Sequence, residues 1–167
     1  MKSQQRSNEF GFTLIELLIV MSVILILMTL AVPAMQKVVK RGNETSAIAS
    51  LRDITAQENT YNSTYPTHGF ACSLSALGGK PEAGAPTPEA AQLIPEDLAS
   101  GNKAGYTFTI SNCTKVTVNN QDMYTSYEAT AVPQSIGKSG HRGFCIDQAG
   151  EIKADPAGGT NCSQPIQ

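Results

Sequence analysis

An unbroken apolar run near the N-terminus most constrains what this chain can fold into. Residues 12–35 (FTLIELLIVMSVILILMTLAVPAM) contain a single ionisable side chain, that of Glu16. At a rise of about 1.5 Å per residue, a helix over this run is roughly 36 Å long, which is enough to cross a hydrocarbon layer of about 30 Å. The run therefore predicts one membrane-spanning helix, followed by a more polar domain over the rest of the 167 residues.

A cleavable secretory signal is the alternative interpretation of the same run. Such signals have an apolar region of about 7–15 residues that ends in small residues of the Ala-x-Ala kind. This run is longer, and its end, PAMQK, does not have that form. The length favours an anchor that stays in the membrane.

The glutamate inside the run needs an explanation. A carboxylate inside hydrocarbon costs about 2.5–3.5 kcal/mol on insertion scales. Ionisable groups in membrane segments usually serve a function and pair with a group of opposite charge. Glu16 is therefore a candidate functional residue. The alternative is an acid close enough to the start of the run to reach the membrane surface.

The basic residues do not decide which way the helix crosses the membrane. Lys2 and Arg6 precede the run, whereas Lys37, Lys40 and Arg41 follow it. The excess of positive charge that marks the cytoplasmic side is therefore nearly balanced.

The cysteines are more informative about orientation. Cys72, Cys113, Cys145 and Cys162 all follow the run, and none belongs to a C-x-x-C pair. An even number in a small Gly-rich domain predicts two disulfides and an oxidising compartment, so the domain is expected outside the cytoplasm. Four cysteines allow three pairings. We favour Cys145–Cys162, which would fix the Gly-rich tail, and Cys72–Cys113, which would tie the segment after the helix to the first strands.

The helical pattern continues over residues 36–64. One face of this second half carries mostly apolar residues at alternating spacings of four and three, which indicates an amphipathic helix. These residues are Ala47, Leu51, Ile54, Glu58, Tyr61 and Tyr65. Because proline is tolerated in spanning helices, we expect Pro33 to kink the helix without ending it. One helix from about residue 12 to about residue 63 is predicted, and its second half needs a surface to pack on.

Residues 65–167 change to loop and strand patterns. Residues 78–105 are rich in Gly and Pro, and Pro88 is placed to start a short helix over residues 89–94. Alternation of apolar and polar residues then predicts antiparallel strands. These strands are expected at 106–110, in part of 124–132, and at 143–146, with a type I turn from Asp147 to Gly150. A long helix followed by a small antiparallel sheet makes the fold class α+β.

The start of the apolar run resembles a known motif. Gly11-Phe12-Thr13-Leu14-Ile15-Glu16 ahead of an apolar helix resembles the N-terminus of type IV prepilins and of the pseudopilins of type II secretion. The resemblance covers residues 2–35 closely, including a short charged leader. The rest of the chain is similar in architecture only, which implies the pilin fold of one long helix packed on a small sheet.

This resemblance implies specific processing and partners. A prepilin peptidase would cut between Gly11 and Phe12, release the leader 1–11 and methylate the new amine of Phe12. Glu16 would meet the amine of a neighbouring subunit, and Pro33 would be the weak point of the assembly helix because residues 12–32 contain no glycine. The implied partners are copies of the chain in a homo-polymer, the peptidase, an inner-membrane assembly platform, and membrane lipid before assembly.

Other kinds of site find little support. No catalytic or cofactor pattern is present, and the two histidines have no spaced partners, so we expect neither an enzyme nor a cofactor. Major pseudopilins often bind calcium, and Asp147, Glu151 and Asp155 suggest such a site, but their spacing favours turn and surface roles. From residue 65 onward, 6 Lys and Arg oppose 9 Asp and Glu, so the general basic surface that nucleic-acid binding needs is absent and such binding is not expected.

The chain is therefore expected to be a structural subunit that polymerises into a type IV pilus filament after cleavage and N-methylation. The alternatives are a pseudopilin that forms a short periplasmic pseudopilus, and a minor pilin for adhesion or DNA uptake. A membrane-anchored binding or sensor domain that never polymerises is a further class. The precursor is expected in the bacterial inner membrane with its N-terminus in the cytoplasm, and the assembled protein at the cell surface or in the periplasm.

Overall fold

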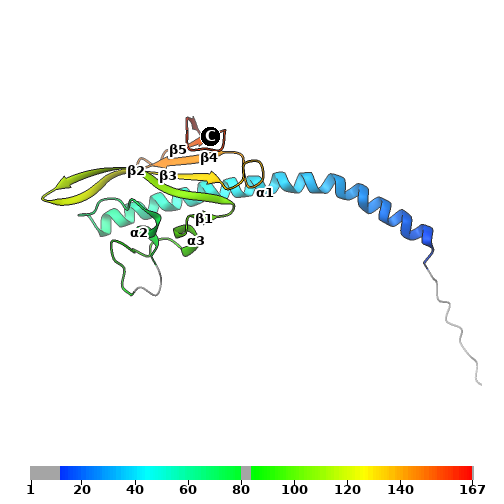
Figure 1. Cartoon of the computed structure of the whole chain (residues 1–167), viewed down its shortest axis with the longest axis horizontal. Coiled ribbons are helices and arrows are strands. Elements are labelled where there is room, and N and C mark those ends of the chain that lie inside the picture. The colour runs from blue at the N-terminus through cyan, green and yellow to red at the C-terminus, as the bar shows by residue number, and fades with distance from the viewer. Residues whose placement is uncertain (1–11, 80–83, 167) are drawn as a thin grey trace, which may run out of the picture. The chain divides into compact units, whose positions relative to one another are not determined.

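The computed structural model describes residues 12–79 and 84–166. The chain divides into two compact units, Met1–Lys37 and Val38–Gln167, and each is described by itself. Helix α1 (Leu14–Thr64) supplies the described helix of the first unit and opens the second (Figure 1). As the sequence predicts, the helix continues through Pro33 and ends just before Pro66.

The half of α1 in the second unit buries the face that the sequence predicts. Ala47, Leu51 and Ile54 are fully buried, and Tyr61 is only 3% exposed. They join one hydrophobic core with apolar side chains of the sheet, and this half of the helix lies along the sheet in Figure 1. Burying one such Leu or Ile side chain stabilises the fold by about 1.5–3 kcal/mol, so this face holds helix and sheet together.

Six strands of the described residues form one antiparallel sheet in the order in which they occur along the chain. They are β1 (Asn102–Lys103), β2 (Tyr106–Val118), β3 (Gln121–Pro133), β4 (Gly143–Asp147), β5 (Ile152–Asp155) and β6 (Gln164–Pro165). Each strand pairs with the next one. The long helix packed on this meander confirms the α+β class.

Strands β2 and β3 are longer than the sequence predicts. They pair as far as Val118 and Gln121, around a turn at Asn119 and Asn120. Both asparagines have positive φ, the conformation that a two-residue hairpin turn of type I′ requires. The register shifts after Ser111, as at a β-bulge. This shift hid the outer part of the hairpin, because it interrupts the strict alternation by which strands are recognised.

The turn after β4 forms where the sequence predicts it. The backbone N–H of Gly150 donates to the carbonyl of Asp147 at 3.0 Å. The carboxylate of Asp147 also accepts a hydrogen bond of 2.9 Å from the N–H of Ala149. Asp147 therefore fixes the turn that joins β4 to β5.

The prediction of a short helix over residues 89–94 is wrong. Thr87 and Ala90 close a tight turn there through backbone hydrogen bonds of 3.2 and 3.0 Å. The helix instead follows Pro95, as α3 (Glu96–Ala99), whose first turn carries two acidic residues. Acidic residues favour a helix start because they oppose the positive end of the helix dipole, and two of them follow Pro95 directly.

A second short helix, α2 (Leu74–Gly78), was not predicted. It begins after Ser73, whose hydroxyl accepts a hydrogen bond of 3.1 Å from the N–H of Ala76. Ser73 is thus a helix N-cap, and Leu74 and Leu77 bury the inner side of the helix.

Two disulfides join distant parts of the second unit. Cys72–Cys113 ties the segment after α1 to β2, and Cys145–Cys162 ties β4 to the segment before β6. These are the two pairings that the sequence analysis favours.

Candidate functional site

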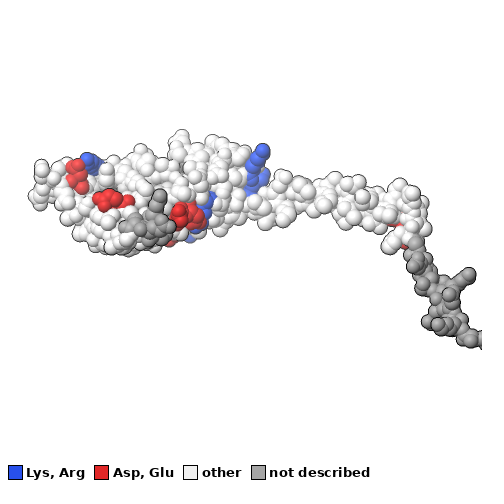
Figure 2. Space-filling view, turned by 60° about the horizontal axis from the view of Figure 1, so that its bottom comes forward, with Lys and Arg blue, Asp and Glu red and all other residues white. Residues whose placement is uncertain are grey.

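The apolar half of α1 turns large hydrophobic side chains outward along its whole length. Every described side chain from residue 12 to residue 39 is exposed. Among the large apolar ones, the exposed fraction runs from 44% at Ile24 to 84% at Phe12. Figure 2 shows a long stretch of this surface without charged atoms, between acidic atoms near its start and basic atoms at its other end. A continuous apolar surface of this extent requires a cover, which is either lipid or other protein.

By length and composition, α1 is the one helix of the described residues that could cross a membrane. Its apolar segment has a mean hydropathy of 2.8. The hydroxyls of Ser22 and Thr29 donate to the carbonyls of Ile19 and Ile26, each at 2.7 Å. These two polar groups are therefore satisfied inside the helix, and Glu16 remains as the charged group of the segment.

Glu16 forms a reciprocal pair with Thr13 at the start of α1. Its Oε2 accepts hydrogen bonds from the backbone N–H of Thr13 at 3.4 Å and from the Thr13 hydroxyl at 3.3 Å. The Thr13 hydroxyl in turn accepts from the backbone N–H of Glu16 at 3.3 Å. This arrangement is a capping box, in which two side chains satisfy backbone donors that the first turn of a helix leaves open.

The capping box places a carboxylate at the positive end of a helix, where it is stabilised. Both of its hydrogen bonds end on Oε2, whereas a carboxylate has about four acceptor positions. Glu16 therefore keeps the capacity to bind a cation. The pattern Thr-x-x-Glu before an apolar helix is typical of a capping box, so the pairing of Thr13 and Glu16 is visible in the sequence.

Of the other residues to which the sequence assigns a role in the N-terminal segment, only Phe12 and Pro33 lie within the described part of the chain. Gly11 and the leader 1–11 lie outside the described residues. Phe12 precedes the helix and extends its ring outward. Pro33 has helical backbone, and because it has no N–H it cannot donate to the carbonyl four residues earlier. That turn of α1 has one backbone hydrogen bond fewer than its neighbours.

Glu44 joins α1 to the loop before β4 in the second unit. Its Oε1 accepts from the N–H of His141 at 3.0 Å, and its Oε2 accepts from the guanidinium of Arg142 at 3.1 and 2.8 Å. Burial alone would raise the pKa of Glu44, but these hydrogen bonds and the charge of Arg142 lower it below its ordinary value. The partners lie 97 and 98 residues away, so no local pattern could have indicated the pair.

Glu58 is a fully buried acid on the apolar face of α1. Its Oε2 accepts a hydrogen bond of 2.7 Å from the backbone N–H of Ala71, and its Oε1 has no partner among the described residues. Burial raises the pKa of Glu58 to about 8, although the bond from Ala71 lowers it in part. The sequence placed Glu58 on this face but assigned it no role. It fixes the segment that leaves α1.

The acids that suggested calcium do not converge. Asp147 caps its own turn, and Glu151 pairs with Lys153 at 3.3 Å. Asp155 accepts backbone hydrogen bonds from three N–H groups of the loop 157–161. In residues 12–79 and 84–166, no group of three or more His, Cys, Asp or Glu side chains is arranged to hold a metal ion. These acids organise turns and a loop.

Comparison with protein families identifies one segment of the chain. Residues 6–32 match the family model described as the prokaryotic N-terminal methylation motif. The matched segment contains the bond after Gly11, the capping box and most of the exposed apolar helix. No curated protein and no solved structure matches the chain.

Proposed function

We propose that this chain, whose methylation motif supports the type IV pilin and pseudopilin family, polymerises into a filament through the apolar half of α1. One observation carries the proposal: in the apolar half of α1 the described large apolar side chains are all exposed, and this half carries a single acid, in its first turn. Membrane lipid covers this surface in the precursor. In the filament, helices of neighbouring copies cover one another.

Processing would give Glu16 a positively charged partner on a neighbouring copy. Cleavage between Gly11 and Phe12 by a prepilin peptidase creates a new amine, which the peptidase methylates. Glycine before the cut has no side chain, so the backbone can enter a tight protease site. The leader leaves, and the new N-terminus lies four residues before Glu16.

In the growing filament, Glu16 pairs with the amine of Phe12 of a neighbouring copy. A charge buried alone in an apolar environment costs several kcal/mol, whereas a well-placed ion pair recovers much of this cost. Because the amine and the acid sit at fixed places on each copy, the pair also sets the register between helices. Pro33 marks the turn of α1 that yields most easily during assembly, since it lacks one backbone hydrogen bond.

A surface type IV pilus is favoured over a periplasmic pseudopilus. Two disulfides suit a fibre outside the cell, which meets oxidation and shear. A calcium site would have favoured a pseudopilin. Two of the acids that suggested such a site, Asp147 and Asp155, instead accept hydrogen bonds within a turn and a loop. An inner-membrane assembly platform would take the processed subunit from the membrane.

The N-terminus of the mature protein tests the processing step. We expect an intact mass that corresponds to residues 12–167 with one methyl group on the Phe12 amine. Gly11→Val should accumulate uncut precursor in the membrane, because the added side chain obstructs entry to the peptidase. Assembled protein that begins at Met1, or at any residue other than Phe12, would rule out this processing.

Variants of Glu16 test the assembly step separately. Glu16→Val should insert into the membrane at least as well as the wild type, because a carboxyl group leaves hydrocarbon. It should nevertheless give few or no fibres, measured by shearing cells and blotting the released protein. Thr13→Val is the comparison variant, because it removes the capping hydroxyl and keeps the carboxylate and the backbone N–H bond to it. It should release fewer fibres than the wild type but clearly more than Glu16→Val. Fibres from Glu16→Val cells in wild-type amounts would show that the pair is not required.

A further inference from the structure

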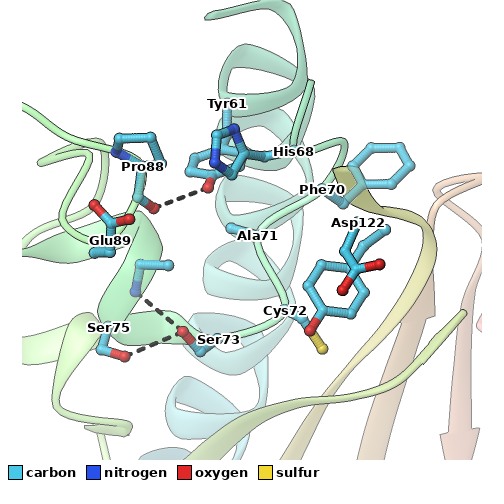
Figure 3. A pocket seen from close by; sticks show the side chains of 12 residues that line it. Tyr61, His68, Phe70, Ala71, Cys72, Ser73, Ser75, Pro88, Glu89 and Asp122 are labelled. Atoms are coloured by element: carbon cyan, nitrogen blue, oxygen red, sulfur yellow. Dashed lines mark hydrogen bonds between the residues drawn. The ribbon is translucent and has the colours of Figure 1, made fainter. Parts of the chain in front are cut away.

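We propose that a cleft on the second unit binds an organic cation, namely an ammonium group carried by a small molecule or by a lysine side chain. The cleft lies between the end of α1, the segment that follows it, the turn at residues 88–89 and β3 (Figure 3). Its volume is about 380 Å³, which falls at the lower end of the range for small-molecule sites. The side chains that matter are Tyr61, His68, Phe70, Glu89, Asp122 and Tyr124.

The aromatic walls of the cleft are held in place by hydrogen bonds. The Tyr61 hydroxyl donates to the carbonyl of Pro88 at 2.8 Å, which fixes the turn that carries Glu89. On the other side, the N–H of Phe70 donates to the carbonyl of Tyr124, and the N–H of Tyr124 donates to the carbonyl of His68, each at 2.9 Å. The Tyr61 ring is thus fixed through its hydroxyl, and the backbone that carries Phe70 and Tyr124 on the opposite wall is paired.

These walls lie on opposite sides of the space. In Figure 3, Pro88 and Glu89 flank Tyr61 on one side, and Phe70 and Asp122 lie on the other. A ligand between them would meet an aromatic ring and a carboxylate together. That pairing is the one that ammonium groups prefer, because the negative face of a ring attracts a cation.

The charges of the cleft are of one sign. Glu89 and Asp122 line it, and no Lys or Arg is among its described lining residues. Asp122 is already compensated, because its carboxylate lies 2.5 Å from the ammonium of Lys115 and accepts from the Thr117 hydroxyl at 2.6 Å. Glu89 takes part in none of the ion pairs of the described residues. The uncompensated negative charge of the cleft is therefore that of Glu89.

This charge favours a cation over a neutral sugar of similar size. A sugar would use the same rings and hydroxyls, but it would gain nothing from the net charge of Glu89. An ammonium group uses both the rings and the charge. The two classes therefore differ in how much they depend on Glu89.

Binding can be measured on the mature full chain in micelles of a polyoxyethylene detergent, which has neither a charge nor a sugar headgroup. The probes are choline, its neutral isostere 3,3-dimethylbutan-1-ol, N-acetyl-lysine methylamide and glucose. The readouts are the NMR ring signals of Tyr61 and Tyr124 and the upfield shift of the ligand protons that lie next to the rings. We expect at least one cationic probe to bind with Kd on the order of 1 mM, and the neutral isostere to bind about tenfold more weakly.

Two variants make the result specific to the cleft. Glu89→Gln should weaken the cationic probe about tenfold and leave any binding of the neutral isostere unchanged. Glu96→Gln is the matched control, because Glu96 is an exposed acid of α3 that does not line this cleft. The tighter of choline and the lysine amide identifies the source of the ammonium group. The proposal is overturned if neither cationic probe binds, if the isostere or glucose binds as tightly as the cation, or if Glu96→Gln weakens binding as much as Glu89→Gln.

Discussion

Glutamine in place of Glu58 should remove most of the pH dependence of stability between pH 5 and pH 8. The carboxyl of Glu58 is fully buried in the core and accepts a hydrogen bond from the N–H of Ala71. Glutamine has nearly the same shape and keeps a carbonyl oxygen for that bond. It has no proton to lose, so the variant isolates the effect of ionisation.

The size and sign of the effect follow from the two pKa values of this carboxyl. Burial raises the pKa of Glu58 from 4.5 to about 8 on folding. The folded state therefore binds the proton more tightly, and the free energy of unfolding is highest below pH 4.5 and falls as the pH rises through 8. Each pH unit in this window costs about 1.4 kcal/mol, so roughly 3 kcal/mol is lost by pH 7 and about 5 kcal/mol above pH 8.

Other shifted groups act outside this window. The pKa of Glu44 is lowered, because hydrogen bonds and the charge of Arg142 outweigh burial, so its contribution is lost only as the pH falls below the ordinary value. Burial raises the pKa of Tyr61 to about 12, which affects stability only in strong alkali. Among the groups with shifted pKa values, Glu58 therefore dominates between pH 5 and pH 8.

The assay is urea unfolding of the mature chain in nonionic micelles, followed by near-ultraviolet circular dichroism of its tyrosines. The wild-type midpoint should fall steadily from pH 5 to pH 8, and that of Glu58→Gln should stay nearly constant. Asp53→Asn is the matched control, because Asp53 lies on the exposed face of the same helix and should follow the wild type. Equal slopes for Glu58→Gln and the wild type would refute the assignment of the proton to this carboxyl.

Two further changes probe the contacts that hold the second unit together. Glu44→Gln should lower the free energy of unfolding by about 2 kcal/mol at pH 7, because the side chain is only 11% exposed and binds a charged partner. The same urea assay checks this, and the loss should vanish at low pH, where Glu44 is protonated in the wild type. Replacing Cys145 and Cys162 together by alanine should cost about 3 kcal/mol, since the disulfide closes a 17-residue separation. The midpoint of thermal unfolding measures this loss, and an unchanged midpoint would contradict it.

The fold could be predicted where a signal is continuous along the chain. The apolar run and the four-and-three spacing from Ala47 to Tyr61 extend without interruption, so the long helix and its buried face follow directly from the sequence. The outer part of the β2–β3 hairpin could not be predicted, because the register shift after Ser111 breaks the alternation. The prediction of the short helices failed for another reason. Both Pro88 and Pro95 are acceptable helix starts, and only the contacts of the folded chain distinguish them.

The polar contacts of the second unit divide in the same way. Asp147 could be recognised, because its partners lie within the turn that it begins. The pair of Glu44 and Arg142 could not, because the two residues are 98 positions apart. Glu58 is an intermediate case: its place on an apolar helix face is visible in the sequence, and that place already indicates a buried acid. Its partner, the N–H of Ala71, depends on how the chain turns back after the helix.

The capping box connects the two roles of Glu16, in the single helix and in the proposed filament. In the membrane, the backbone N–H and hydroxyl of Thr13 give the carboxylate two hydrogen bonds, which offset part of the cost of an acid in an apolar segment. These bonds also fix the position of Oε2 at the first turn, so an incoming amine meets a carboxylate that is already oriented. An oriented group loses less conformational entropy when it binds than a mobile one does. With cleavage after Gly11 as proposed, the acid, the cap and the new N-terminus would lie within five consecutive residues, 12–16. The same first turn would then be stable in lipid and ready to receive a charge.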